Sequence, residues 1–523
     1  MPHSATRGAR EGLLYRWFRH WQRARFRLIE VTRCGAARLR EKSAGCAPKI
    51  TTRFSAWFVG SWLLGSRYSW LHLEFLRLMS DVEDLTVDAE VPEGYWRDCA
   101  NWAPAGQPRG LSRPRSTEEL QALARWATQH AVPLVPRGAG TGVAGGANAV
   151  DGCVIVSFER MNSILELNEA GMYAVVEPGV LNVELKNAAR ERGLWYAPDP
   201  ASYEISTLGG NVATNAGGLC CVKYGVTGDS VLGLEAVLAS GELLKTGGFC
   251  RKNKAGYDLS HLLVGSEGTL AMISKIILRL RRLPPSPGTL VALFGSLEAA
   301  GAAAASIVRN VEPSLLEIMD RAALVAVENY ARLGIEHDAA AMLLAQSDAG
   351  GASELELMQR ACEVAGAQLV YATTEHQEGE LLLRARRLAY PALERLVQVL
   401  LDDISVPLPR LAEMLRRIEQ VAARQEILVA TVAHAGDGNI HPFIVFDAKD
   451  EQSTARARAV FAELMAIALE LGGTITGEHG IGALKPEFLE GQLGALSLSL
   501  HHGIKKVFDP QGILNPGKVL RRW

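Results

Sequence analysis

Glycine-rich loops that follow short strand-like runs are the feature that most limits how this chain can fold. The 51 glycines of the 523 residues gather in loops at 138–146, 207–218 and 265–268 rather than spreading evenly. Glycine loses more conformational freedom on folding than any other residue, so such clusters indicate a backbone that must approach a ligand closely.

The first of these loops contains Gly140-Thr141-Gly142-Val143-Ala144-Gly145, which satisfies the dinucleotide-binding pattern G-x-G-x-x-G. In a Rossmann unit this motif opens a helix. Here residues 148–152 lead directly into another predicted strand, 153–157, which argues against a Rossmann unit. The loop still follows a predicted strand, 132–135, and its small residues can present N–H groups to an anion beside Arg137. The alternative is an ordinary flexible loop.

A second feature is a pair of histidines, His434 and His441, on either side of Gly436-Asp437-Gly438-Asn439. Residues 427–433 and 442–446 predict two strands, and the tetrapeptide predicts the turn between them. With that loop, His434 would lie directly opposite His441, with Cβ atoms about 4.5–5.5 Å apart on one sheet face. The alternative is a turn without a ligand.

Glu478 and His479 follow further along the chain, between the glycines of the segment 477–482. Two imidazoles and one carboxylate with a fourth position open are the ligand set of a catalytic metal site. The candidate ligands are His434, His441 and Glu478.

Composition excludes several classes of protein. A net charge of −2 with 21% charged residues offers no basic surface for nucleic acid. The eight cysteines form no C-x-x-C motif, so neither an iron–sulfur cluster nor a disulfide framework is indicated, and reduced cytosolic thiols are expected.

The N-terminal 80 residues differ from the rest, with 15 Lys and Arg against 4 Asp and Glu. Arg-rich, acid-poor sequence resembles a targeting peptide, although a start at Met79 preceded by an extension without a folded role explains it equally well. The apolar run 54–65 is too short to span a bilayer. A cytoplasmic protein is expected, with a peripheral inner-membrane location or a mitochondrial location as alternatives.

The length predicts two or three domains. Residues 81–284 form the first expected domain, which ends at Pro284-Pro285-Ser286-Pro287. Across 285–505 strands and helices alternate, which predicts an α+β domain on an antiparallel sheet that also carries the metal site. The turn-rich tail 506–523 is expected to return to the first domain.

Several segments together resemble a known family. Those of the first domain are 135–142 (VPRGAGTG), 176–180 (VEPGV), 197–202 (APDPAS), 208–218 (LGGNVATNAGG) and 265–270 (GSEGTL), and those beyond it are 434–441 (HAGDGNIH), 477–482 (GEHGIG) and 515–518 (NPGK). The first set resembles the FAD-binding domain of the PCMH, or vanillyl-alcohol-oxidase, type. The second set resembles its 2-hydroxy-acid dehydrogenase branch, which holds D-lactate dehydrogenases, D-2-hydroxyglutarate dehydrogenase and the FAD subunit of glycolate oxidase. The resemblance implies an α+β fold, with a two-subdomain FAD-binding domain and a ferredoxin-like cap domain.

The resemblance also implies which residues bind FAD, through the pyrophosphate, the flavin and ribityl chain, the adenine side and a closing contact. They are Arg137, Gly138, Gly140, Thr141, Gly142, Pro198, Ser202, Gly209, Asn211, Asn215, Gly217, Gly268, Thr269, Ile273 and Asn515. Relatives with covalent FAD use a His or Cys in these loops. Because no histidine lies between 137 and 218, non-covalent FAD is expected.

The resemblance assigns Glu478 to the metal and His479 to proton removal from the substrate hydroxyl. Zinc is the expected metal, although two imidazoles and one carboxylate suit manganese as well. Arg386 would clamp the substrate carboxylate, with Arg387 pointing outward; the alternative for Arg386 is a solvated helix face. Hydroxyglutarate-type relatives carry a Lys near the segment 400–407, which here has no basic residue. D-lactate or glycolate is therefore the preferred substrate, with D-2-hydroxyglutarate as the alternative.

Two other functions stay open: non-redox chemistry on the same fold, as in alkylglycerone-phosphate synthase, and a flavin subunit that passes electrons to partner chains. The electron acceptor could be a quinone, cytochrome c, an electron-transfer flavoprotein or a partner subunit, and a homodimer is also left open.

Overall fold

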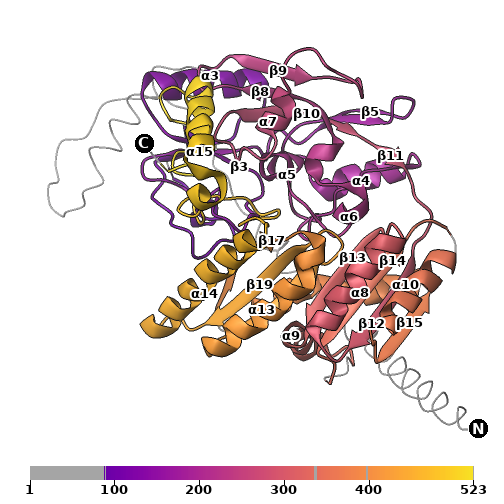
Figure 1. Cartoon of the computed structure of the whole chain (residues 1–523). Coiled ribbons are helices and arrows are strands. Elements are labelled where there is room, and N and C mark those ends of the chain that lie inside the picture. The colour runs from indigo at the N-terminus through magenta and orange to yellow at the C-terminus, as the bar shows by residue number, and fades with distance from the viewer. Residues whose placement is uncertain (1–86, 89, 335–337, 351, 396–397, 522–523) are drawn as a thin grey trace, which may run out of the picture.

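The computed structural model describes residues 87–521 apart from 89, 335–337, 351 and 396–397 (Figure 1). The basic segment 1–80, with the expected targeting signal or later start at Met79, lies outside the described residues. Within the described ranges, no helix combines the length and the apolar character needed to cross a membrane.

Two sheets make up the first half of the described chain. The first is four-stranded in the order β1-β2-β4-β3, with parallel pairing of β4 to both its neighbours. The second is five-stranded and antiparallel in the order β5-β6-β10-β8-β9. The strands are β1 (Val87–Asp88), β2 (Gly110–Ser112), β3 (Leu134–Arg137), β4 (Val154–Ser157), β5 (Ile164–Asn168), β6 (Tyr173–Val176), β8 (Val231–Val237), β9 (Leu243–Gly247) and β10 (Met272–Arg279).

Helices cover these sheets, and a two-stranded ribbon of β7 and β11 lies beside them. Ser116 begins α3 by accepting a hydrogen bond from Glu119 N, and the buried face of α3 packs in the core of the first sheet. The remaining elements are η1 (Glu93–Tyr95), α3 (Thr117–Gln129), α4 (Asn182–Arg190), β7 (Leu194–Trp195), α5 (Leu208–Thr214), α6 (Cys221–Tyr224), η2 (Thr227–Ser230), α7 (Leu259–Leu263) and β11 (Arg281–Arg282).

One of the three expected glycine loops is partly helical, so the expectation of an irregular segment at 207–218 was wrong for α5. Thr207 Oγ1 accepts a hydrogen bond from Gly210 N, and Asn215 ends the helix in the left-handed region at φ 52°. Gly209 and Gly210 carry low helix propensity. A Cβ on Gly209 would lie 2.5 Å from Pro178 Cβ, so tight packing explains the glycine there.

The second half of the chain forms an eight-stranded antiparallel sheet in the order β15-β12-β14-β13-β18-β19-β16, with β17 also paired to β19. Its first four strands alternate with helices in the order β12-α8-β13-α9-β14-α10-β15, which is a ferredoxin-like arrangement with α9 added. The expected α+β fold is thereby confirmed. The elements are β12 (Gly288–Phe294), α8 (Leu297–Asn310), β13 (Leu315–Asp320), α9 (Arg321–Ala331), β14 (Ala341–Ser347), α10 (Ala352–Val364), β15 (Leu369–Thr373), α11 (His376–Arg387), α12 (Ala389–Leu393), β16 (Gln398–Leu401), β17 (Ile404–Ser405), η3 (Leu408–Arg410), α13 (Leu411–Arg424), β18 (Leu428–His434), β19 (Asn439–Phe446), α14 (Glu451–Glu470) and α15 (Leu489–Phe508).

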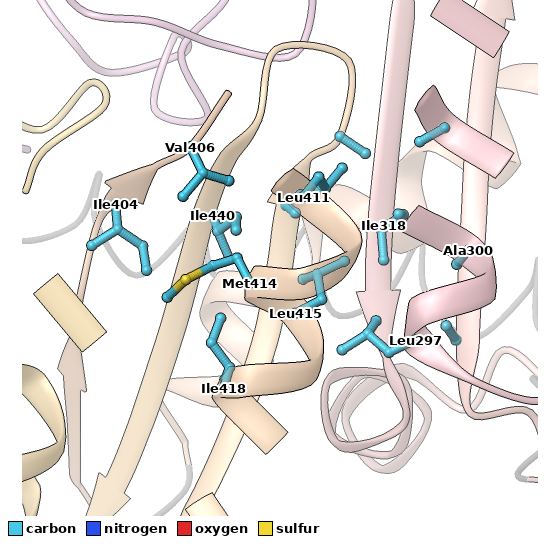
Figure 2. Packing of buried hydrophobic residues seen from close by; sticks show 14 of the residues in the cluster. Leu297, Ala300, Ile318, Ile404, Val406, Leu411, Met414, Leu415, Ile418 and Ile440 are labelled. Atoms are coloured by element: carbon cyan, nitrogen blue, oxygen red, sulfur yellow. The ribbon is translucent and has the colours of Figure 1, made fainter. Parts of the chain in front are cut away.

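The largest core lies between this sheet and the helices α8, α13 and α14. The buried residues of α13 recur at helical spacing, which turns one face of the helix to the sheet. Figure 2 shows Met414 and Ile418 of α13 beside Ile404 and Ile440 of the sheet. This core includes Ala433 and Ile440 of the β18–β19 hairpin, and their neighbours His434 and His441 point to the opposite face of the sheet.

The C-terminal part joins the two halves. Leu489 of α15 belongs to the core of the eight-stranded sheet, whereas Ile504 and Phe508 at its other end pack against the core of the five-stranded sheet. The chain then runs beside β3, where Leu134 N donates to Ile513 O at 2.8 Å and Asn515 N donates to Leu134 O at 2.8 Å. Figure 1 shows α15 in yellow next to the first two sheets.

Candidate active site

The hairpin of β18 and β19 carries both histidines, but with a register that differs from the expected one. His434 pairs with Asn439, and His441 pairs with Val432. Direct opposition of the two histidines was therefore wrong. Asn439 is drawn into the strand because it also pairs with Ser405 of β17, which leaves residues 435–438 as the turn. The histidines still share a sheet face as diagonal neighbours, and their ring centroids lie 5.0 Å apart.

Gly438 makes this turn possible. Its φ is +84°, and an added Cβ would overlap the carbonyl oxygen of Val406. We expect Gly438→Ala to lower the free energy of unfolding by about 1–3 kcal/mol through backbone strain alone, and further through the overlap. Gly472→Ala is the matched control, because Gly472 has φ +79° with open space around its Cβ position. Urea denaturation of both variants tests this, and an equal loss in both would contradict the role of the overlap.

Glu478 lies between the two imidazoles. Its Oε1 is 3.3 Å from His434 Nε2 and 3.2 Å from His441 Nε2. The ligand atoms of these three residues all lie within 4.8 Å of one another. Two buried nitrogen ligands and one half-buried carboxylate that converge in this way suit a divalent cation such as zinc. The residues present therefore fit a metal site.

The charges in this cluster stabilise each other. Burial alone would raise the pKa of Glu478, but His434 and His441 hold it well below its usual range. Burial alone would lower the pKa of His434, but Glu317 and Glu478 raise it well above its usual range. Burial lowers the pKa of His479 to about 4, against the opposing charge of Asp403, so that its imidazole is uncharged at neutral pH.

A buried ion pair between Glu317 and Arg386 contacts His434 on the Nδ1 side of its ring. His434 Nδ1 lies 2.7 Å from Glu317 Oε1, and Arg386 Nε donates to Glu317 Oε2 at 2.7 Å. Glu317 thus holds His434 with its Nε2 toward Glu478, as carboxylates commonly do behind metal-binding histidines. Arg386, expected to clamp the substrate, is engaged with Glu317.

A cavity of about 470 Å³ lies next to the metal cluster and includes Glu478 and His479 among its lining residues. Arg387 also lines it, so the expectation that Arg387 points outward was wrong, while Arg386 is not among the described lining residues. The other walls come from the glycine loops. Of the residues expected at FAD, the cavity is lined by Arg137, Gly138, Gly140, Thr141, Gly142, Ser202, Gly209, Asn211, Gly217, Gly268 and Ile273.

The remaining four expected FAD residues are not among the described lining residues of the cavity. Pro198 O accepts a hydrogen bond from Asn182, and Asn215 Oδ1 accepts one from Gly228 N. Thr269 O accepts one from Lys505, and Asn515 donates to Gly146 O and Glu267 O. Gly146 and Glu267, the acceptors of Asn515, line the cavity, so Asn515 supports its wall.

The cavity fits a large polar ligand such as FAD. Asn211 lines it, and its buried Nδ2 has no hydrogen-bond partner within the described chain. Gly138 lies so close to Thr207 that a Cβ would overlap the Thr207 hydroxyl, so position 138 has no room for a side chain. Arg137 donates to Arg97 O at 2.9 Å and to Gly94 O at 3.0 Å, which fixes the start of the first loop.

The sequence analysis did not assign a role to three acidic residues of this region. Glu267 lines the cavity and accepts hydrogen bonds from Ile481 N at 2.8 Å and Gly482 N at 2.9 Å, and burial raises its pKa to about 7. Glu317 and Asp403 support the metal cluster. The available signal was a charged residue inside a run of apolar ones, as in Leu315-Leu316-Glu317-Ile318-Met319.

Comparison with known proteins agrees with this architecture. Residues 108–247 match a family described as FAD binding domain, and residues 283–519 match one described as FAD linked oxidases, C-terminal domain. Glycolate oxidase subunit GlcD of Bacillus subtilis is 40% identical over 420 residues, covering 79% of this chain and 89% of the relative. A D-lactate dehydrogenase of Archaeoglobus fulgidus is 37% identical over 412 residues, covering 78% of this chain and 91% of the relative.

Solved structures share the fold at low sequence identity. p-Cresol methylhydroxylase with bound substrate aligns with a TM-score of 0.70 at 17% identity, covering 86% of this chain and 97% of the other. Alkyldihydroxyacetonephosphate synthase aligns with a TM-score of 0.64 at 18% identity, covering 90% and 89%. Because one fold carries both an oxidative enzyme and a synthase by name, the fold alone does not select the reaction.

Proposed function

This chain belongs to the FAD-linked oxidase family and is an FAD-linked oxidoreductase, and from that premise we propose that it oxidises a D-2-hydroxy acid to the 2-oxo acid. The observation that carries the proposal is the position of Glu478 and His479, which line the cavity enclosed by the FAD-binding loops. One candidate metal ligand and the candidate base thus line the cavity that we propose for the flavin.

The proposed substrate class rests on the candidate metal ligands beside the cavity. A 2-hydroxy acid offers a carboxylate and a hydroxyl oxygen side by side, which suits chelation by a hard or borderline cation. A divalent cation held by His434, His441 and Glu478 would supply Lewis acidity that lowers the pKa of the substrate hydroxyl. FAD, when bound, supplies the acceptor for a hydride from C2.

The residues of the chain then have separate tasks. His479, uncharged and next to Glu478, removes the hydroxyl proton; its Nε2 lies 3.6 Å from Glu478 Oε1. Arg387 lines the cavity and binds the substrate carboxylate. Arg386 acts through Glu317 and His434 and keeps the ligand cluster in place.

A small monocarboxylic acid is the preferred substrate. Arg137 and Arg387 are the only Lys or Arg side chains among the described lining residues, and Arg137 is bound to backbone carbonyls. The guanidinium of Arg387, which lies 4.0 Å from Glu380 Oε2, therefore remains for a single substrate carboxylate, as in D-lactate or glycolate. D-2-hydroxyglutarate would need a second cation.

Anaerobic mixing of the purified flavoprotein with D- and L-hydroxy acids tests the proposal. We expect D-lactate or glycolate to bleach the flavin absorbance at low millimolar concentration, L-lactate not to bleach it, and D-2-hydroxyglutarate to act weakly. Preferential bleaching by D-2-hydroxyglutarate would contradict the monocarboxylate assignment, and no bleaching by any 2-hydroxy acid would contradict the function itself.

Removal of the metal is a separate prediction. Dialysis against a strong chelator should abolish bleaching by the preferred acid while FAD stays bound, and added Zn²⁺ or Mn²⁺ should restore it. Full bleaching by a protein whose metal content is negligible by mass spectrometry would favour a metal-free reaction on the same fold.

The third candidate, a flavin subunit within a larger assembly, is favoured by the name of one relative, a subunit of glycolate oxidase. Turnover with an artificial dye should then proceed in the isolated chain, whereas turnover with a quinone, cytochrome c or an electron-transfer flavoprotein should need added partner chains. Efficient turnover of the isolated chain with one of these natural acceptors would exclude this candidate.

A further inference from the structure

We infer that Asp403 is the positioning residue of the site: one oxygen of its carboxylate holds the loop that carries Glu478 and His479, and the other orients His441 for metal binding through Nε2. The inference rests on the proposed function, because it concerns the same metal cluster, and it assigns a role to a residue that the reaction itself does not touch.

Asp403 lies between β16 and β17, and its side chain is 1% exposed. Its Oδ2 accepts hydrogen bonds from the successive backbone N–H groups of residues 477, 478 and 479 at 2.9, 3.1 and 2.9 Å. The same oxygen accepts one from Thr476 Oγ1 at 2.6 Å. Consecutive N–H groups around one anion fix the backbone of a loop that contains no regular secondary structure. Both the proposed ligand and the proposed base are attached to this backbone.

The other carboxylate oxygen faces His441. Asp403 Oδ1 lies 3.6 Å from His441 Nδ1, and both atoms are buried without a hydrogen-bond partner. Because a carboxylate only accepts, a small closing movement pairs the two atoms when the proton is on Nδ1. That tautomer leaves Nε2, which points at Glu478 Oε1, with a free lone pair for the metal. Glu317 stands in the same relation to His434.

Asp403 also lies within 4.8 Å of ligand atoms of His441 and His479, so it could be taken for a metal ligand. Its Oδ2, however, already accepts four hydrogen bonds. The buried ammonium of Lys485 donates to Asp402 Oδ1 at 2.8 Å, Asp403 O at 2.9 Å and Ile475 O at 2.6 Å. This cation joins the two chain segments and compensates the buried negative charge. The geometry therefore assigns Asp403 a supporting role.

The substitution Asp403→Asn separates this role from a purely structural one. The amide oxygen can still accept from the loop, but the amide N–H₂ then faces His441 Nδ1 and favours the proton on Nε2, which blocks metal binding. We expect the zinc affinity of the FAD-containing protein to fall about 10–100-fold, as for loss of other carboxylate partners of metal-binding histidines. Competition with a chromophoric chelator measures it, and FAD content and far-UV circular dichroism should match those of the parent protein.

Asp402→Asn is the matched control, since Asp402 is a neighbouring buried carboxylate on the same Lys485. Its described side-chain hydrogen bonds come from Lys485 and from the backbone N–H of Asp403, and none comes from residues 476–479 or His441. Its zinc affinity should stay within about twofold of the parent value. Unchanged zinc affinity in Asp403→Asn, or an equal loss in Asp402→Asn, would overturn the inference.

If Asp403→Asn does not fold, the parent protein still provides a test. Nitrogen-15 spectra of histidine-labelled protein, assigned with His441→Gln, should show a proton on Nδ1 of His441; a proton on Nε2 would refute the inference. The two proposals also fail separately. A parent protein that binds zinc but oxidises no hydroxy acid would refute the function, whereas zinc binding that is insensitive to Asp403→Asn would refute only the role of Asp403.

Discussion

Replacement of His479 by alanine is expected to lower the rate of anaerobic flavin reduction by the preferred acid by about 10²–10⁴-fold. The side chain lines the cavity, and burial lowers its pKa to about 4, so it is an uncharged proton acceptor at neutral pH. Its neighbour Glu478 has its Oε1 within 3.3 Å of His434 Nε2 and 3.2 Å of His441 Nε2 and is a proposed metal ligand. His479 is the one histidine among the described lining residues of the cavity.

Stopped-flow absorbance at the flavin maximum measures this rate. Zinc content, FAD content and the Kd of an unreactive 2-oxo acid should change little, because His479 is not among the proposed ligands. Added imidazole should restore part of the rate, which a loss through misfolding would not allow. His501→Ala on the exposed side of α15 is the control histidine. A rate within a few-fold of the parent value in His479→Ala would remove His479 from the mechanism.

The second large effect distinguishes the adjacent residues Arg386 and Arg387. Arg386 is buried against Glu317, whose side chain is 1% exposed. Arg386→Met leaves that carboxylate buried without its cation, which costs about 3–5 kcal/mol of the free energy of unfolding. Because Glu317 also holds His434, zinc affinity should fall together with stability.

Arg387→Met should leave stability and zinc affinity unchanged but weaken substrate binding. Its side chain is 36% exposed, so the midpoint of urea denaturation and the zinc content should stay close to the parent values. Loss of a charged hydrogen bond to the substrate carboxylate should raise KM about 10–100-fold. Steady-state assays and denaturation curves on both variants decide the assignment. A raised KM with full stability in Arg386→Met, and no change in Arg387→Met, would return the clamp to Arg386.

The glycine loops and the donor residues could be predicted from the sequence because their chemistry is local. A run such as 208–218 has few uses other than close approach to a ligand, and two imidazoles beside a carboxylate favour a cation wherever they meet. The same run also shows the limit of local reasoning. Its glycines predict a loop, yet Thr207 caps a helix there, and close packing against Pro178 explains why position 209 is a glycine within that helix.

The hairpin register could not be predicted from its own residues. The tetrapeptide 436–439 suits a four-residue turn, but Asn439 pairs with Ser405, a residue far away in the sequence. That contact moves the turn by one residue and converts directly opposed histidines into diagonal ones. The metal cluster survives because side chains of a strand alternate between faces, and a diagonal pair still shares one face.

The sequence by itself therefore determined the family, the flavin loops and the three candidate ligands, since each depends on residue types at short spacing. Only the tertiary structure decided which arginine reaches the cavity, because Arg386 and Arg387 differ by the direction in which a helix turns them. It also brought Asp403, Glu317 and Glu267 into hydrogen bonds with the site, on which their proposed supporting roles rest. Their partners lie on other strands and loops, so their roles exist only once the chain has folded.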